Sequence, residues 1–304
     1  MRHILRSRAG AVCLTLAVTA GVAAAAFLPH AGAAAVPTRA AVQSGVTVNS
    51  NSKAAVDVSN LSEGFVMVRY TGGKQVRIKV QIGKSGGTTY TYNLNNAGNY
   101  ETFPLTEGDG TYNVRVFENI SGTRYAQAYS TSVTLKLRDP FLPFLYPNQY
   151  VNFSEDSATV AKAAEIVKDA ATDLDKIQAI FTWVTKNFTY DYELAKNPPV
   201  GYLPDVDKVL AAQKGICFDY ASVMASMLRS QEIPCKLVVG YAGSVYHAWI
   251  NAYIDGVGWV DKVIYFDGKN WTLMDPTFVS TGKGCSSIMK YVTTPSNYVQ
   301  KYAY

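Results

Sequence analysis

Gly215-Ile216-Cys217-Phe218-Asp219-Tyr220-Ala221 is the stretch that decides the fold of the second half of this 304-residue chain. It opens a helix predicted to run from Cys217 to about Ser230, because apolar side chains then recur at helical spacing. A thiol at a helix N-terminus lies beside unpaired backbone N–H groups, which favour the thiolate. The same groups can hold the oxyanion that forms when the thiolate attacks a carbonyl. The alternative is a buried structural cysteine.

A possible triad with Cys217 is completed by a histidine and an aspartate that lie further along the chain. His247 lies in a strand predicted over 246–254, and Asp275 ends a strand predicted over 271–274, before Pro276-Thr277. If these strands are antiparallel neighbours, the carboxylate can reach the far nitrogen of the imidazole and fix its tautomer. Taken singly, His247 also fits a structural histidine, and Asp275 a strand-end cap.

The order and spacing of the three residues resemble the transglutaminase-like superfamily. The gaps are 247−217 = 30 and 275−247 = 28 residues, and the resemblance extends from about residue 155 to 300. It implies an α+β, papain-like core in which a nucleophile helix packs on an antiparallel sheet. It also implies Cys217 as nucleophile, His247 as base and Asp275 as orienter, with a thioacyl intermediate that passes to an amine or to water.

Several other residues near these motifs are candidates for smaller roles. Gln213 and Tyr202 lie upstream of the nucleophile and could supply a second oxyanion donor. Trp249 shares the strand face of His247, where it could shape the cleft or belong to the core. Cys235 and Cys285 could form a disulfide, which would leave Cys217 single in an oxidising compartment.

The first 35 residues indicate a secretory signal peptide. Three arginines precede an apolar run over 11–28, and small residues at 33–35 fit a cleavage site. The alternative is a retained membrane anchor, because the run is near spanning length. Cleavage would remove three arginines and no acidic residue, so the net charge would fall from +5 to +2 (5 − 3 = 2). That charge gives no reason to expect nucleic acid as a partner. Signal cleavage would also leave His247 as the single histidine of the mature chain, which excludes a multi-histidine zinc site.

Residues 45–138 predict a β-sandwich-like domain. Runs rich in Val, Ile, Tyr and Thr over 64–70, 75–83, 88–94 and 111–118 are separated by glycine- and asparagine-containing turns. Tyr112 fits a tyrosine corner. A proline-containing linker over 139–153 leads to the transglutaminase-like domain at 154–304. There, a capping box at Thr172–Asp175 is predicted to begin a helix.

These features predict a secreted cysteine protease or amidase, or a transglutaminase-like acyltransferase, that acts on peptide or glutamine-type amide bonds. The expected partner is an extracellular protein or peptide, with cell-wall peptide as one class. No cofactor or metal is expected, nor any membrane association after signal cleavage, and the oligomeric state is left open. Two alternatives are a non-catalytic surface or wall-associated binding or scaffolding protein that keeps the fold, and a β domain that binds glycan through tyrosines such as Tyr90, Tyr92, Tyr112 and Tyr125.

Overall fold

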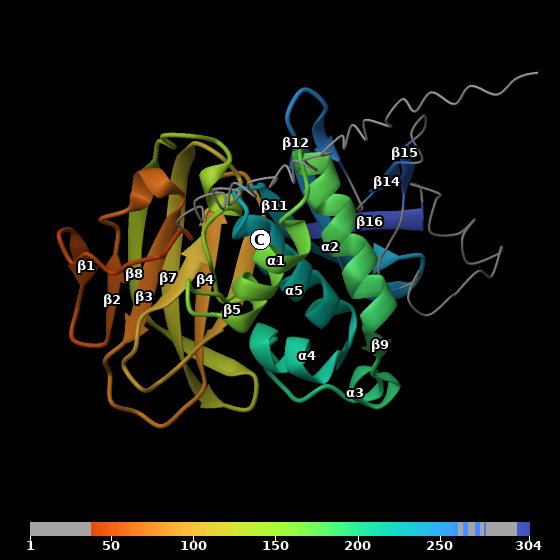
Figure 1. The fold of residues 1–304 in the computed structure, drawn as a ribbon. Coiled ribbons are helices and arrows are strands. Elements are labelled where there is room, and N and C mark those ends of the chain that lie inside the picture. Colours follow the sequence, from red (N-terminus) through yellow and green to blue (C-terminus); the bar gives the residue numbers. More distant parts are fainter. Residues whose placement is uncertain (1–37, 261–263, 267–270, 274–276, 278–296) are drawn as a thin grey trace, which may run out of the picture. The chain divides into compact units, whose positions relative to one another are not determined.

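The structure, a computed structural model, describes residues 38–260, 264–266, 271–273, 277 and 297–304. These residues belong to one compact unit that runs to Tyr304. Strands prevail as far as Leu135, and helices followed by strands make up the rest (Figure 1). The predicted α+β fold is therefore confirmed, while the boundaries of the two domains and of the linker stay predictions.

The N-terminal part contains two four-stranded antiparallel sheets. The first has the order β1-β2-β3-β6 and consists of β1 (Val48–Ser50), β2 (Ala54–Asp57), β3 (Phe65–Tyr70) and β6 (Glu101–Pro104). The second has the order β5-β4-β7-β8 and consists of β4 (Ile78–Lys84), β5 (Thr89–Leu94), β7 (Gly110–Ser121) and β8 (Arg124–Leu135). A short 3-10 helix, η1 (Leu61–Glu63), precedes β3.

The two sheets share one apolar core. Side chains alternate between exposed and buried along β5, as expected for a strand with one face in a core. Tyr92 of β5 and Phe103 of β6 contact each other across the sheets, with ring centroids 4.8 Å apart. The buried Tyr112 donates a hydrogen bond to the Gly108 carbonyl at 2.8 Å, which confirms the predicted tyrosine corner.

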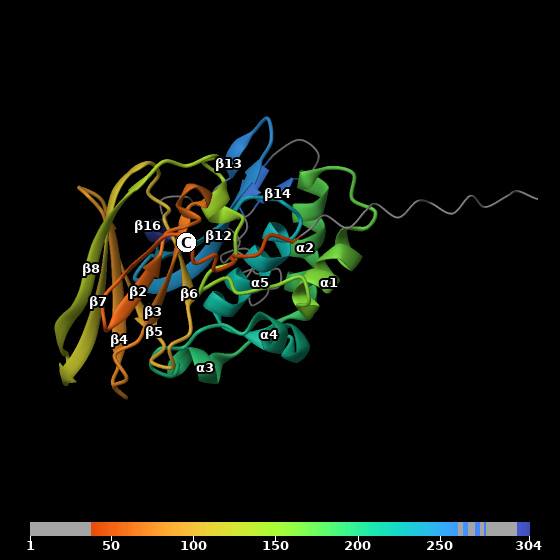
Figure 2. The ribbon, with the colours of Figure 1, turned by 90° about the vertical axis from the view of Figure 1, so that its left-hand side faces the viewer.

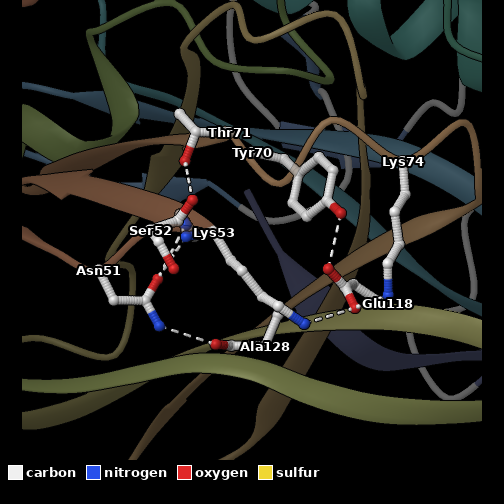
Figure 3. A network of polar contacts seen from close by, with 9 residues as sticks. Asn51, Ser52, Lys53, Tyr70, Thr71, Lys74, Glu118 and Ala128 are labelled. Carbon is white, nitrogen blue, oxygen red and sulfur yellow. Dashed lines mark hydrogen bonds and ion pairs between the residues drawn. The ribbon is translucent and has the colours of Figure 1, made fainter.

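A buried carboxylate links the two sheets (Figure 3). Glu118 of β7 is 4% exposed and accepts a hydrogen bond from the Tyr70 hydroxyl of β3 at 2.6 Å. Lys53 and Lys74 reach the other carboxylate oxygen at 2.9 and 3.1 Å. Burial alone would raise the pKa of Glu118, but these partners outweigh it and lower the pKa to about 2.

Among the described residues, five α-helices follow the sandwich, and α1, α2 and α4 pack against α5. After the short 3-10 helix η2 (Leu142–Phe144) they are α1 (Ala158–Val167), α2 (Asp173–Asn187), α3 (Tyr192–Lys196), α4 (Val206–Ala212) and α5 (Cys217–Arg229). The Thr172 and Asp175 side chains each bond the other's backbone N–H, which confirms the predicted capping box. Two short parallel strands, β9 (Thr189–Tyr190) and β10 (Lys214–Gly215), connect the segment after α2 to the segment before α5.

The C-terminal sheet has the order β13-β12-β11-β16 and is antiparallel. It consists of β11 (Cys235–Ala242), β12 (Val245–Ile254), β13 (Gly258–Val260) and β16 (Tyr298–Ala303), and β14 (Ile264–Phe266) pairs with β15 (Trp271–Leu273) separately. Helix α5 lies between the other helices and strands β11 and β12 (Figure 2). Its side chains are buried from Asp219 to Arg229, so it is the central helix of this part. No helix among the described residues is both long and apolar enough to span a membrane.

A cluster of tyrosines joins the sandwich to the helical part. Tyr304 packs against Tyr92 of β5 and against Tyr150, with centroid distances of 5.8 and 4.5 Å. Tyr150 in turn contacts Phe218 of α5 at 5.3 Å. Because Phe218 follows Cys217, the sandwich supports a wall beside the predicted nucleophile. Three of the tyrosines considered for glycan binding, namely Tyr90, Tyr92 and Tyr112, are buried, which argues against that role.

Candidate active site

Cys217 is the first residue of α5, as the sequence predicts. Ile216 before it is extended, with φ −98° and ψ 177°, so the chain turns into the helix at the cysteine. The thiol is free and the residue is half-buried. The N–H groups of a first helical turn have no partner within the helix, so the thiol lies beside partial positive charge.

A buried carboxylate fixes this turn. Asp219 is fully buried and accepts a hydrogen bond from the Ile216 N–H at 2.8 Å. Its other oxygen accepts one from the Tyr202 hydroxyl at 2.7 Å. Burial raises the pKa of Asp219, and these two hydrogen bonds oppose that rise. A side chain at position 215 would meet this carboxylate, because a Cβ on Gly215 would lie 2.6 Å from the Asp219 Cβ.

His247 lies near the start of β12 and pairs with Gly240 of β11. Its side chain is 5% exposed and stacks on Trp249, with ring centroids 6.2 Å apart. Gly240 is needed opposite the histidine, since a Cβ there would lie 2.1 Å from the Val299 carbonyl oxygen and 2.9 Å from the Trp249 ring. Gly240 therefore leaves room for the Trp249 ring, on which the imidazole stacks, and for the backbone of β16.

Cys217 and His247 line the same cleft, which has a volume of about 620 Å³. We call it the Cys217 cleft. Its other lining residues are Tyr150, Tyr190, Ala195, Pro198, Pro199, Tyr202, Ile216, Phe218, Val239, Val245, Tyr246, Ala248 and Tyr304. Apart from His247, none of these described residues has an acidic or basic side chain. Among the described residues, no hydrogen bond joins the thiol to the imidazole, although such bonds are often long before substrate binds.

The tyrosines of the cleft stay protonated near neutral pH. Burial raises the pKa of Tyr150 to about 12 and, together with the charge of a Cys217 thiolate, that of Tyr190 to about 12. Burial also raises the pKa of Tyr246 and, with its bond to Asp219, that of Tyr202. Apart from Tyr202, whose hydroxyl donates to Asp219, these phenols can donate hydrogen bonds to a substrate, and none of them acts as a base.

The structure separates the remaining candidates. Tyr202 lines the cleft, but its hydroxyl is bound to Asp219, so its place is that of a positioning residue rather than an oxyanion donor. Gln213 ends α4 with a left-handed φ of 47°, is exposed and does not line the cleft. Trp249 is 2% exposed and packs with Tyr298 behind the histidine, so it belongs to the core. Sequence reasoning missed Tyr150, Tyr190 and Tyr304 as lining residues, because each arrives from a distant segment.

The structure does not describe the third triad candidate or one of the two cysteines of the predicted disulfide. Asp275 and Cys285 lie outside the described residues. Cys235 is a buried free thiol, and burial raises its pKa to about 12. The expected pairing of Cys235 with Cys285 stays a prediction, because Cys285 lies outside the described residues. Within β11, Cys235 packs as a small apolar side chain. Within the described residues, no group of three or more histidine, cysteine or acidic residues could hold a metal ion.

Residues 160–262 match the model of the transglutaminase-like superfamily. The chain is 26% identical to the kyphoscoliosis peptidase of Mus musculus over 129 residues, which cover 38% of this chain and 17% of that protein. It is also 26% identical over 188 residues to the Bacillus subtilis protein YebA, which cover 54% of this chain and 25% of YebA. The chain thus spans a quarter or less of the length of these relatives.

Solved structures give more distant similarities. One, from Cytophaga hutchinsonii and described as a candidate cysteine protease, covers 85% of this chain and 74% of that chain at 16% identity and a TM-score of 0.41. Red sea bream transglutaminase covers 75% of this chain and 53% of that chain at 12% identity and a TM-score of 0.26. At these TM-scores neither similarity bears on function. The match to the family model and the helix-on-sheet arrangement around Cys217 identify the core as transglutaminase-like.

Proposed function

We propose that the transglutaminase-like domain makes this chain a cysteine acyl-transfer enzyme, with Cys217 as nucleophile, His247 as base and Asp275 as orienter. One observation carries the proposal: a free, half-buried thiol at a helix N-terminus lines the same cleft as a buried imidazole. A structural cysteine gains nothing from this position, whereas a nucleophile needs both the N–H groups and the base.

The proposed reaction has two halves. In the first, the Cys217 thiolate attacks the carbonyl carbon of an amide, and a C–S bond forms while the carbonyl π electrons move to the oxygen. The C=O bond then re-forms, the C–N bond breaks, and the leaving amine takes the proton held by His247. In the second half, water or an amine loses a proton to His247 and attacks the thioester, which releases the thiolate. Water gives hydrolysis and an amine gives transfer; we favour hydrolysis.

The cleft also suggests the substrate. Its walls are aromatic and aliphatic, and its rim includes the exposed Val245 and Tyr246. A charged side chain next to the reacting amide would lose water there without gaining a counter-ion from the described lining. We therefore propose an uncharged, apolar segment of an extracellular protein or peptide, including cell-wall peptides, as the acyl donor.

The test uses a library of amide-bonded peptides with and without a primary amine such as cadaverine. Mass spectrometry should detect an acyl group on Cys217 and either cleaved peptide or an amine adduct. Cys217→Ala should abolish both, whereas Cys235→Ala, which also removes one thiol, should keep them. Activity that survives Cys217→Ala would refute this mechanism, and a protein that is never acylated would favour a binding role.

Export is a separate part of the proposal. Residues 1–35 have the composition of a signal peptide, and the proposed substrates lie outside the cell. N-terminal sequencing of the protein from culture medium should give a mature chain that begins near residue 36. A chain that stays in the cell with its first residues intact would contradict export.

A further inference from the structure

The sheet of β5, β4, β7 and β8 turns one of its faces away from the apolar core. Side chains alternate along each strand, and residues that pair across the sheet share a face. We call the face away from the core the outer sheet face, and none of its side chains is buried. It consists of Arg77, Lys79, Gln81, Gly83, Thr89, Thr91, Asn93, Thr111, Asn113, Arg115, Phe117, Asn119, Tyr125, Gln127, Ser130, Ser132 and Thr134.

The outer sheet face carries basic side chains and no acidic one. Its basic residues are Arg77, Lys79 and Arg115. Glu118, the acidic residue of the four strands, is buried on the opposite face. Among the described residues, none of the three basic side chains forms an ion pair with a carboxylate. The positive charge of this face is therefore not neutralised by the protein.

Charge is also divided unevenly along the chain. Residues 36–137 contain 10 basic and 6 acidic residues, a net charge of +4 (10 − 6 = 4). Residues 138–304 contain 15 basic and 17 acidic residues, a net charge of −2 (15 − 17 = −2). Such an asymmetry between two halves indicates an anionic partner for the basic half. The outer sheet face holds three of the basic residues in that half, so it is the surface that fits such a partner.

The three basic residues form a row. Arg77 and Lys79 are two positions apart along one strand, which separates them by about 7 Å. Lys79 pairs with Phe117, so Arg115 lies diagonally opposite at about 7–8 Å. Burial and the charge of Arg77 lower the pKa of Lys79, as expected for neighbouring cations without an acid between them. Steps of this size suit a linear polymer that carries one acidic group per sugar-sized unit.

The remaining side chains of the face suit a partner rich in hydroxyl groups. Amide and hydroxyl groups both donate and accept hydrogen bonds, and they occupy most of the other positions. Phe117 and Tyr125 are half-buried aromatic residues that expose part of a ring, against which the apolar C–H face of a sugar can pack. Tyr125 is the one tyrosine considered for glycan binding that is not buried in the sandwich.

We propose that the outer sheet face binds a linear acidic polysaccharide, with its carboxylates on Arg77, Lys79 and Arg115. The exported protein would meet such a polymer at the cell surface, and binding would keep the Cys217 cleft there. The inference does not depend on the acyl-transfer reaction, because Cys217 takes no part in this contact.

The test measures binding of the mature chain to immobilised polygalacturonate at low salt, with neutral dextran as the uncharged polymer. We expect Lys79→Gln/Arg115→Gln to weaken binding roughly tenfold, because each exposed charge pair contributes modestly. Lys79→Arg/Arg115→Lys keeps both charges and should bind like wild type. The matched control, Lys168→Gln/Lys186→Gln, removes the same charge from exposed positions on the helical part and should also bind like wild type.

Four results would overturn the inference and leave the acyl-transfer proposal standing. Equal weakening by the two glutamine pairs would mean that only net charge matters. Binding to dextran as tight as to polygalacturonate, or binding unchanged by added salt, would mean that the cations do not recognise the polymer. Binding to duplex DNA but not to polygalacturonate would assign the face to nucleic acid instead.

Discussion

The Tyr202 hydroxyl donates a hydrogen bond to the buried Asp219 carboxylate, with 2.7 Å between the two oxygens. The same carboxylate holds the Ile216 N–H, so a loop on the cleft wall and the turn before the nucleophile share one acceptor. Tyr202, which belongs to the loop before α4, thus helps to position the thiol of Cys217.

Tyr202→Phe should loosen this turn. The change removes a hydrogen bond to a buried carboxylate whose pKa is already raised by burial. We expect the free energy of unfolding to fall by about 1–2 kcal/mol and alkylation of Cys217 to slow. Urea unfolding and iodoacetamide kinetics measure the two effects, with Tyr192→Phe as the control. Unchanged values in both assays would show that the bond does not position the turn.

Gly215→Ala should disturb the same turn by steric overlap. Its new methyl would lie 2.6 Å from the Asp219 Cβ and 2.8 Å from Asp219 Oδ2, which real contacts do not reach. The carboxylate must then move from the Ile216 N–H. We expect a loss of about 1–3 kcal/mol in unfolding free energy together with slower acylation of Cys217. A variant as stable and reactive as wild type would mean that Asp219 can shift without consequence.

Arg229 should be important for stability rather than chemistry. Its guanidinium is fully buried, and burial lowers its pKa to about 10. It donates to the backbone carbonyls of Cys235, Tyr146 and Tyr304 at 2.7–3.0 Å, which ties the end of α5 to the linker and to the residue after β16. A lysine at position 229 cannot reach all three carbonyls, so we expect Arg229→Lys to lower the free energy of unfolding by about 2–4 kcal/mol. Thermal unfolding tests this against Arg124→Lys, an exposed arginine on β8 that should show no change.

Glu118 should make the stability of the sandwich depend on pH. Its folded pKa of about 2 lies below the ordinary value of 4.5. The contribution of the bonded carboxylate (Figure 3) is therefore complete above pH 4.5 and is lost as the pH falls towards 2. Because Lys53 and Lys74 are partly exposed, we expect the carboxylate to contribute about 1–2 kcal/mol to the free energy of unfolding. Chemical unfolding of wild type and Glu118→Gln should differ at pH 7 and converge near the folded pKa. A difference that is constant with pH would contradict this origin.

The sequence predicts the local features of this fold well. The strands around Tyr92 and Tyr112, the Thr172–Asp175 capping box and the start of α5 at Cys217 all depend on neighbouring residues, and the structure has them where expected. Such features follow from side-chain alternation, capping and helical spacing, which act over a few residues.

Contacts between distant segments were not predictable in the same way. Tyr190 reaches the nucleophile turn through its pairing with Gly215, 25 positions further along (215 − 190 = 25). Tyr304 enters the cleft because β16 pairs with β11, and Tyr150 enters it from the linker. Trp249 lies on the same strand face as His247, as predicted, but Tyr298 packs against its ring. Alternation predicts a face of a strand, whereas only the packed neighbours decide whether that face is cleft or core.

The pairing of Cys217 with His247 is tested most directly by iodoacetamide labelling of the native protein at pH 6. An ordinary thiol, with a pKa of about 8.5, is almost entirely protonated at this pH and reacts slowly. We predict that Cys217 is modified at least about tenfold faster in wild type than in His247→Ala, with the modified residue identified by peptide mapping. Equal, slow labelling in the two proteins would contradict an activated thiol and leave a transglutaminase-like fold without its reaction.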